Sequence, residues 1–292
     1  MGKVILAGLI VIGTLNLIGC DLQPDTYNLT IQVQGEGEVQ PGPGTSYYPE
    51  ETAIDLRAIP AEGWQFYRWH GAVAEPFSPE TTVLVDEKKT IRAIFTNNSG
   101  PTILAAPGGL ITKRADGSRV DLRPLGSKDI QYIMLHAISD SAGNPTKPYQ
   151  MERIRAIFDD YSVESHYAID RAGVIYRFVE DNRVARHAGV GSWADDPNLK
   201  NKMNRFAIGI ELLGMGTTTE MADVIGSKAN SKVKAKDRGF TEAQYQALDV
   251  LVQHLREQYG IPRENVITHK GYDPERKWDP GVLFDWRKIG LK

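Results

Sequence analysis

Residues 206–213 read Phe-Ala-Ile-Gly-Ile-Glu-Leu-Leu, an apolar run of strand length with one carboxylate, Glu211, inside it. A continuous apolar run of this kind is typical of a strand that is buried on both faces of a sheet. Burial disfavours the charged form of a carboxyl group, so we expect the pKa of Glu211 to be raised. The run therefore predicts a central strand that holds one ionisable side chain in an apolar environment.

Shorter elements of both kinds surround this run. Apolar segments of strand length lie at 130–135, 166–170, 174–179 and 266–268, and helically spaced apolar residues lie at 149–158 and 241–259. Thr241 is a good N-cap for the second helix, and Gly260 ends it just before Pro262. Strands interleaved with helices predict an α/β domain, residues 129–292, with a central mixed β-sheet flanked by helices.

Residues 21–97 have a different pattern, in which apolar and polar residues alternate and glycine and proline mark the turns. This pattern predicts a small, mostly β module. Residues 58–69 resemble the internalin-type B-repeat of bacterial surface proteins, in the pattern A-x-P-x-x-G-aromatic-x-F-x-x-W. The resemblance implies a spacer or adhesion module. Trp64, Phe66 and Trp69 either fill its core, which we favour, or form a platform that stacks on sugars.

Residues 98–128 are rich in glycine, proline and polar side chains. This composition predicts a linker, with a hairpin around Ala115-Asp116-Gly117.

The N-terminal residues 1–20 have the features of a lipoprotein signal peptide. Lys3 precedes an apolar run, 4–18, that suits a secretory signal and is too short for a lasting membrane span. The run leads into Leu17-Ile18-Gly19-Cys20, which resembles the bacterial lipobox. The resemblance implies a diacylated Cys20 that tethers the protein to a membrane of the cell envelope, facing the periplasm or the cell wall. A plain signal peptide or an N-terminal core helix is the alternative.

Charge and cysteine content exclude several classes of protein. The 292 residues carry 34 basic and 37 acidic side chains, a formal net charge of −3, so nucleic acid is not expected as a partner. Cys20 is the single cysteine, which excludes an internal disulfide and any multi-cysteine zinc or iron–sulfur site.

Three candidate metal ligands lie at or beyond the ends of predicted strands. His136 follows the strand at 130–135, His269 follows the strand at 266–268, and Asp279 lies further along the chain. Two imidazoles and one carboxylate suit catalytic zinc, with a fourth position left for water. Each residue alone fits a polar side chain that enters a loop equally well, so the pattern by itself leaves both interpretations open.

Six segments occur in one order along the second domain: Ile133-Met134-Leu135-His136, Ser165-His166-Tyr167-Ala168-Ile169-Asp170-Arg171, Ala185-Arg186-His187-Ala188-Gly189, Ala207-Ile208-Gly209-Ile210-Glu211-Leu212, Val266-Ile267-Thr268-His269 and Arg276-Lys277-Trp278-Asp279-Pro280-Gly281. Together they resemble the type 2 N-acetylmuramoyl-L-alanine amidases, the family that includes the peptidoglycan recognition proteins. The resemblance implies a zinc hydrolase that cuts the amide bond between N-acetylmuramic acid and L-alanine in peptidoglycan or muropeptides.

The same resemblance implies roles for five residues. His136, His269 and Asp279 would bind one zinc ion per amidase domain. Glu211 would act as the catalytic acid and base, and Lys277 would place a positive charge at the oxyanion of the reaction. The alternatives are a structural Glu211 paired with an arginine and a solvated surface Lys277.

Three further residues are candidates for substrate binding. The resemblance implies that Tyr167 lies beside the metal and His187 near the sugar–peptide groove, although a hydrogen-bonded structural role fits His187 equally. Trp193 either lines the groove or packs against the domain. His166 precedes Tyr167 on a strand and should face the other way, so we interpret it as structural.

Residues 214–238 depart from the family pattern as a longer, polar, lysine-bearing insertion after the Glu211 strand. The insertion is either a mobile flap that sets substrate choice or an inert surface loop.

The sequence as a whole predicts a monomeric, membrane-tethered peptidoglycan amidase that acts in cell-wall remodelling or recycling. The alternatives are a non-catalytic envelope protein that binds peptidoglycan or muropeptides, and an envelope adhesin in which the amidase is secondary. The preference between intact peptidoglycan and anhydro-muropeptides stays open.

Overall fold

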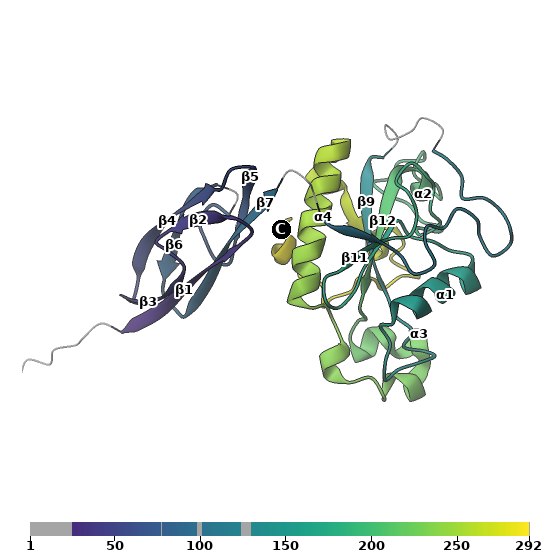
Figure 1. Cartoon of the computed structure of the whole chain (residues 1–292). Helices are drawn as coiled ribbons and strands as arrows, with labels where there is room; N and C mark the ends of the chain where they lie inside the picture. The colour runs from purple at the N-terminus through teal and green to yellow at the C-terminus, as the bar shows by residue number, and fades with distance from the viewer. Residues whose placement is uncertain (1–24, 77, 98–100, 124–129, 292) are drawn as a thin grey trace, which may run out of the picture. The chain divides into compact units, whose positions relative to one another are not determined.

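The chain divides into two compact units between Thr96 and Asn97 (Figure 1). The computed structural model describes residues 25–76, 78–97, 101–123 and 130–291. The expected signal peptide and its Cys20 lie outside these residues. Within the described ranges, no helix is both long and apolar enough to span a membrane.

The first unit is built of short strands. They are β1 (Thr26–Gln34), β2 (Gly37–Gln40), β3 (Gly44–Pro49), β4 (Thr52–Pro60), β5 (Trp64–His70), β6 (Glu80–Val85) and β7 (Lys89–Asn97). They form two sheets, in the orders β3-β1-β7-β5 and β2-β4-β6. Alternate residues such as Leu29, Leu56 and Val83 are buried between them, so the expected mostly β module is confirmed.

The aromatic residues of this unit pack into its core. Trp69 is fully buried, and its ring centroid lies 5.6 Å from that of Phe66. Trp64 and Phe66 are half-buried against the same core. This packing favours a structural role for all three residues over a platform for sugars.

A six-stranded mixed sheet forms the centre of the second unit, in the order β13-β9-β12-β10-β11-β8. The strands are β8 (Ile103–Ala105), β9 (Tyr132–Ile138), β10 (Tyr167–Ile169), β11 (Ile175–Arg177), β12 (Ala207–Leu213) and β13 (Val266–Thr268). β9 pairs in parallel with both β12 and β13, and β12 pairs in parallel with β10, whereas β10 and β11 are antiparallel. The predicted α/β fold with a central mixed sheet is confirmed.

Helices flank this sheet. They are α1 (Met151–Tyr161), α2 (Met203–Phe206), α3 (Thr218–Asn230), α4 (Glu242–Tyr259) and α5 (His269–Tyr272), with 3₁₀ turns at Ala235–Asp237, Arg263–Asn265 and Trp286–Ile289. The predicted limits of α4 are confirmed. Thr241 caps its start in a reciprocal capping box with Gln244, and Gly260 ends it in the left-handed conformation.

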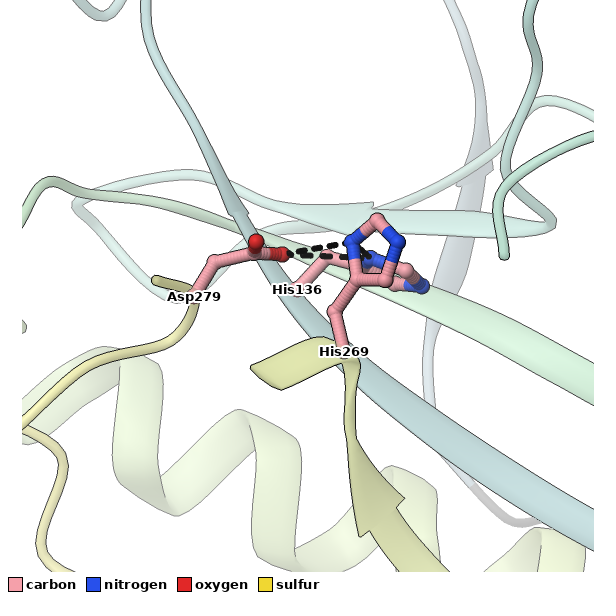
Figure 2. Close-up of side chains that lie close together, drawn as sticks. All are labelled: His136, His269 and Asp279. Carbon is pink, nitrogen blue, oxygen red and sulfur yellow. Dashed lines mark hydrogen bonds and ion pairs between the residues drawn. The ribbon is translucent and has the colours of Figure 1, made fainter. Parts of the chain in front are cut away.

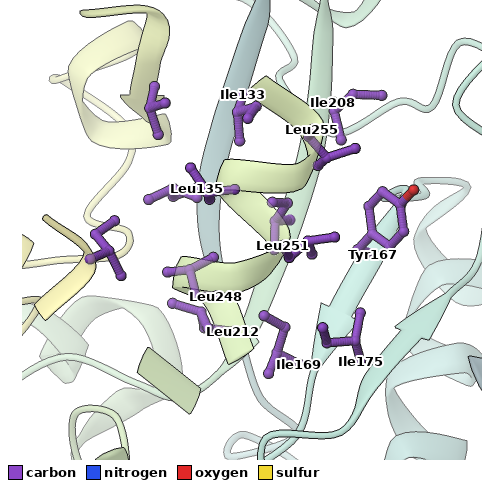
Figure 3. Close-up of a cluster of buried hydrophobic side chains, with 14 of the residues drawn as sticks. Ile133, Leu135, Tyr167, Ile169, Ile175, Ile208, Leu212, Leu248, Leu251 and Leu255 are labelled. Atoms are coloured by element: carbon purple, nitrogen blue, oxygen red, sulfur yellow. The ribbon is translucent and has the colours of Figure 1, made fainter. Parts of the chain in front are cut away.

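One face of the sheet packs against α4 (Figure 3). Leu135 on β9 and Ile208, Ile210 and Leu212 on β12 belong to this apolar layer. Successive side chains of a strand point to opposite faces. The next residue on β9, His136, and the residue between Ile210 and Leu212 on β12, Glu211, therefore point to the face opposite α4. This alternation decides on which side of the sheet the candidate site lies.

For residues 101–123, the structure corrects the linker expected at residues 98–128. β8 pairs in parallel with β11, and Ile111 and Val120 are buried in a cluster with residues of α1. Arg114 forms a buried ion pair with Glu164. Residues 101–123 are thus part of the second unit. Only a few separate side chains and one three-residue strand hold this segment to the second unit. The remaining residues are free to be glycine, proline or polar, so the composition resembles that of a linker. The expected turn at Ala115-Asp116-Gly117 is present, closed by a bridge between Lys113 and Arg119.

The buried pair gives a stability prediction. Replacing Arg114 by methionine leaves the Glu164 carboxylate buried without its cation, and we expect a loss of about 3 kcal/mol in the free energy of unfolding of the second unit. Urea unfolding followed by the helical circular dichroism signal measures this loss. The neighbouring Lys113 is exposed, so Lys113→Met is the matched control and should leave the transition unchanged. Equal midpoints for the two variants would contradict the prediction.

Candidate metal centre and active site

Three side chains converge on the face of the sheet opposite α4, as Figure 2 shows. His136 Nδ1 lies 3.0 Å from His269 Nδ1, and Asp279 Oδ2 lies 3.1 Å from His269 Nδ1 and 3.3 Å from His136 Nδ1. All three residues are buried. The structure thus brings together the three residues that the sequence suggested as metal ligands.

The sheet and one loop hydrogen bond position these side chains. β13 pairs with β9 so that Thr268 lies opposite Leu135. The residues that follow, His136 on β9 and His269 at the start of α5, therefore lie at the same level of the sheet. Asp279 comes from the loop after α5, where the Lys270 N–H donates to the Asp279 carbonyl at 2.9 Å. That bond ties the aspartate loop to the start of α5.

The distances fit a tetrahedral metal site. Zinc bonds of about 2.0–2.1 Å to nitrogen and oxygen place two tetrahedral ligand atoms about 3.3 Å apart. The three distances between Nδ1, Nδ1 and Oδ2 are close to that value. The donor set, two imidazoles and one carboxylate, is the chemistry that catalytic zinc takes. His136, His269 and Asp279 therefore fit a zinc ion with one open position.

Outer hydrogen bonds direct the ligand nitrogens toward this centre. His269 Nε2 lies 3.0 Å from the Ala188 carbonyl, which can only accept a hydrogen bond, so Nε2 carries the proton and the Nδ1 lone pair faces inward. His187 Nε2 lies 3.4 Å from the Ala207 carbonyl, and His187 Nδ1 lies 3.0 Å from His136 Nε2. This chain assigns a proton to each Nε2 and leaves His136 Nδ1 free for a metal.

The local electrostatics keep the ligands in their binding forms. Burial and the neighbouring His269 lower the pKa of His136 to about 4, although Asp279 opposes the shift. Burial alone would raise the pKa of Asp279, but the close contacts with His136 and His269 hold it well below its usual value. Neutral imidazoles and an ionised carboxylate are the forms that bind a metal near neutral pH.

Glu211 lies beside this centre. Its Cα lies opposite that of His136 across the β9–β12 ladder, so both side chains share one face. Glu211 is 8% exposed, and burial followed by the negative charge of Asp279 raises its pKa well above the usual value. Among the described residues Glu211 forms no ion pair with an arginine, so the structural alternative has no support. The half-buried Lys277 opposes the pKa shift with its positive charge.

The expectation that Tyr167 lies beside the metal is wrong. β10 pairs with β12 so that Ala168, and not Tyr167, lies opposite Glu211. Tyr167 therefore points into the α4-facing core, where its hydroxyl donates to Asp181 Oδ1 at 2.6 Å and accepts from Arg177 at 2.9 Å. Figure 3 shows this ring among the apolar side chains.

His166 takes the face that was expected for Tyr167. His166 Nδ1 accepts from the Gly209 N–H at 3.0 Å, and its ring centroid lies 5.6 Å from that of His187. These contacts agree with the expected structural role of His166. The His166 ring lies against His187, and His187 contacts His136, so the three rings form a row that we call the imidazole row. The sequence signal for this role was its alternation with Tyr167 on the strand.

His187 and Trp193 have different surroundings. His187 is buried behind His136, which favours the hydrogen-bonded role over direct contact with a substrate. Trp193 is half-buried against Gly271 and lines a cavity of about 480 Å³ along β13, together with Arg263 and Trp286. The described residues of that cavity do not include the His–His–Asp centre, and a role of Trp193 in substrate binding stays a prediction.

Comparison with known proteins identifies both units. Residues 126–282 match the N-acetylmuramoyl-L-alanine amidase family, and residues 27–99 match the divergent InlB B-repeat domain. The chain belongs to the N-acetylmuramoyl-L-alanine amidase family. The expectation of an enzyme, a hydrolase of this class, is thereby confirmed, and the non-catalytic alternative finds no support.

Individual relatives are amidases as well. The chain is 28% identical over 194 residues to the 1,6-anhydro-N-acetylmuramyl-L-alanine amidase AmpD of Haemophilus influenzae, covering 62% of this chain and 92% of the relative. It is 32% identical over 141 residues to the N-acetylmuramoyl-L-alanine amidase AmiD of Escherichia coli, covering 46% of each. The match thus spans most of the first relative and about half of the second.

Solved structures of amidases also match. The crystal structure of a selenomethionine AmpD derivative has a TM-score of 0.46 at 26% identity, over 65% of this chain and 93% of the other. E. coli AmiD in complex with anhydro-N-acetylmuramic acid-L-Ala-D-γ-Glu-L-Lys has a TM-score of 0.42 at 28% identity, over 55% and 56%.

The imidazole row gives a prediction for metal binding. Replacing His187 by alanine removes the hydrogen-bond partner that orients His136, and we expect zinc affinity to fall about 10- to 100-fold. Competition with a chromophoric chelator measures the affinity. His254→Ala, a half-buried histidine on α4, is the control and should bind zinc like the wild type. Unchanged affinity in the His187 variant would show that His136 needs no such support.

Proposed function

We propose that the protein is a zinc-dependent amidase of the cell envelope that hydrolyses the bond between N-acetylmuramic acid and L-alanine. The observation that carries the proposal is the convergence of His136, His269 and Asp279 next to the buried Glu211. The relatives support the substrate class, because AmpD is named for 1,6-anhydro-N-acetylmuramyl-L-alanine and AmiD binds an anhydro-muropeptide. We therefore propose muropeptides as the substrate and wall recycling or remodelling as the role.

The metal would be held by the two Nδ1 atoms and Asp279 Oδ2, which leaves a coordination position for water or substrate. A zinc ion bound there would act as a Lewis acid that polarises the scissile carbonyl and makes water nucleophilic near neutral pH. The outer hydrogen bonds of His136 and His269 hold both rings in the required tautomer.

Glu211 would move the proton that amide hydrolysis requires. It accepts the proton of the attacking water while the C–O bond forms, and it donates that proton to the leaving nitrogen of L-alanine as the C–N bond breaks. A raised pKa suits both steps, because the group must hold and release a proton near neutral pH. Glu211 is buried, so bulk water has little access to this exchange.

Lys277 would stabilise the negative charge that develops on the carbonyl oxygen. Its position two residues before Asp279, with a positive charge that reaches both Glu211 and His136, supports this role. A cation placed where charge develops lowers the barrier more than it strengthens substrate binding.

The proposal is tested by digestion of purified peptidoglycan and of anhydro-muropeptides with the full chain. Mass spectrometry should detect free stem peptides that begin with L-alanine. Glu211→Gln keeps the size of the side chain but cannot transfer the proton, so we expect turnover to fall about 10²- to 10⁴-fold. Glu257→Gln, an exposed change on α4, is the control.

Two outcomes would contradict this mechanism. Glu211→Gln is expected to bind zinc as the wild type does, so full turnover in that variant removes Glu211 from the reaction. Chelation is expected to abolish hydrolysis, and added zinc should restore it. Hydrolysis that persists after complete metal removal would overturn the proposed centre.

We also propose that Cys20 anchors the protein to a membrane, with residues 21–97 as the spacer. The support is the Leu17-Ile18-Gly19-Cys20 segment at the end of an apolar run. We expect the wild type to incorporate labelled palmitate and to appear in the membrane fraction. The Cys20→Ser variant should do neither. An inhibitor of lipoprotein signal peptidase should block maturation of the wild type only. Unlabelled wild-type protein would exclude the anchor. The expected monomeric state stays a prediction.

A further inference from the structure

The insertion at residues 214–238 is folded against the metal-ligand loop. It contains α3 and the 3₁₀ turn at Ala235–Asp237, and the Gly239 N–H closes it by donating to the Met215 carbonyl at 2.9 Å. Met215, Met221 and Val233 form a small buried cluster against Trp278, the residue before Asp279. The insertion is therefore packed next to the loop that carries the third ligand.

One carboxylate links the start of α3 to this loop. Glu220 Oε2 accepts from the N–H and the hydroxyl of Thr217, at 2.9 and 3.0 Å, in the capping box of α3. The other oxygen, Oε1, accepts from the Val282 N–H at 2.9 Å. Glu220 thus holds the backbone three residues after Asp279.

The Glu220 carboxylate lies so close to Gly216 and Gly281 that neither position has room for a side chain. A Cβ on Gly216 would lie 2.7 Å from Glu220 Oε2, and a Cβ on Gly281 would lie 2.8 Å from Oε1. The same two atoms would lie 2.9 and 3.0 Å from the ring of Trp278. Such distances are well below a van der Waals contact, so any side chain at either position would displace Glu220 or Trp278.

The charge of Glu220 is maintained by its partners. Burial would raise the pKa of Glu220, but hydrogen bonds from Thr217 and Val282 and the charge of Lys270 lower it below the usual value. The group is therefore ionised near neutral pH, and its bonds to N–H donors are charge-assisted.

We infer that Glu220 is a positioning residue that clamps the 278–282 loop and so fixes the Asp279 carboxylate at the metal centre. The inference rests on the proposed zinc site. On the α5 side the loop is held by the bond from the Lys270 N–H to the Asp279 carbonyl. Glu220 holds it on the α3 side, so the ligand lies between two fixed points. Outer partners of metal ligands commonly control the affinity of a site in this way.

The inference is tested by zinc affinity, measured on the full chain in detergent by competition with a chromophoric chelator. Glu220→Ala frees the Val282 N–H, and we expect zinc to bind about tenfold more weakly. Glu220→Gln keeps an oxygen that can accept from Val282, so its affinity should stay close to that of the wild type. Thr241→Ala breaks the equivalent capping box of α4 and should leave zinc affinity unchanged.

A second variant covers the case in which Glu220→Ala does not fold. Gly216→Ala retains Glu220 but places a methyl group against its carboxylate, and it should weaken zinc binding as well. If the wild type and Glu220→Ala bind zinc equally, the clamp is overturned while the metal centre stands. If the wild type itself binds no zinc, the proposed function fails.

Discussion

Parallel pairing of β9 with β12 on one side and β13 on the other is the constraint on which the candidate site depends. The register sets Glu211 opposite His136 and Thr268 opposite Leu135. Backbone hydrogen bonds of the ladders therefore bring His136 next to His269, 133 positions away in the chain. Because the carboxyl ends of parallel strands meet at one edge of the sheet, the three candidate metal ligands and the buried Glu211 carboxyl group come together near that edge.

The two faces of the sheet have different roles, because one packs into the apolar core and the other carries the candidate site. The face toward α4 is apolar, whereas the opposite face buries His136, His166 and His187. Burying polar groups costs free energy unless they are hydrogen-bonded, and each of these rings has a partner. The same bonds leave the Nδ1 lone pairs of His136 and His269 facing each other at 3.0 Å beside a carboxylate. Such an arrangement of electron pairs is stabilised by a cation, which is why the donor set fits zinc.

Sequence reasoning succeeded where a pattern is long and continuous. The apolar run at 206–213 and the capped helix α4 were predictable because burial on both faces and capping leave local signals. Tyr167 was misplaced because β10 has three residues, too few to reveal which face is apolar, and only its pairing with β12 decides that. Residues 101–123 were misread as a linker because their contacts are distant, such as the Arg114–Glu164 pair, and leave no local period.

The third proposed ligand, Asp279, differs from the other two in how the chain holds it. His136 and His269 follow directly from paired strands, so their positions are as rigid as the sheet. Asp279 follows no strand, and a loop has many conformations that place its carboxylate elsewhere. A ligand on a loop must be restrained from outside, and the bonds of its loop to Lys270 on one side and Glu220 on the other provide that restraint. An insertion next to such a loop can therefore change the affinity of the proposed metal site without contributing a ligand.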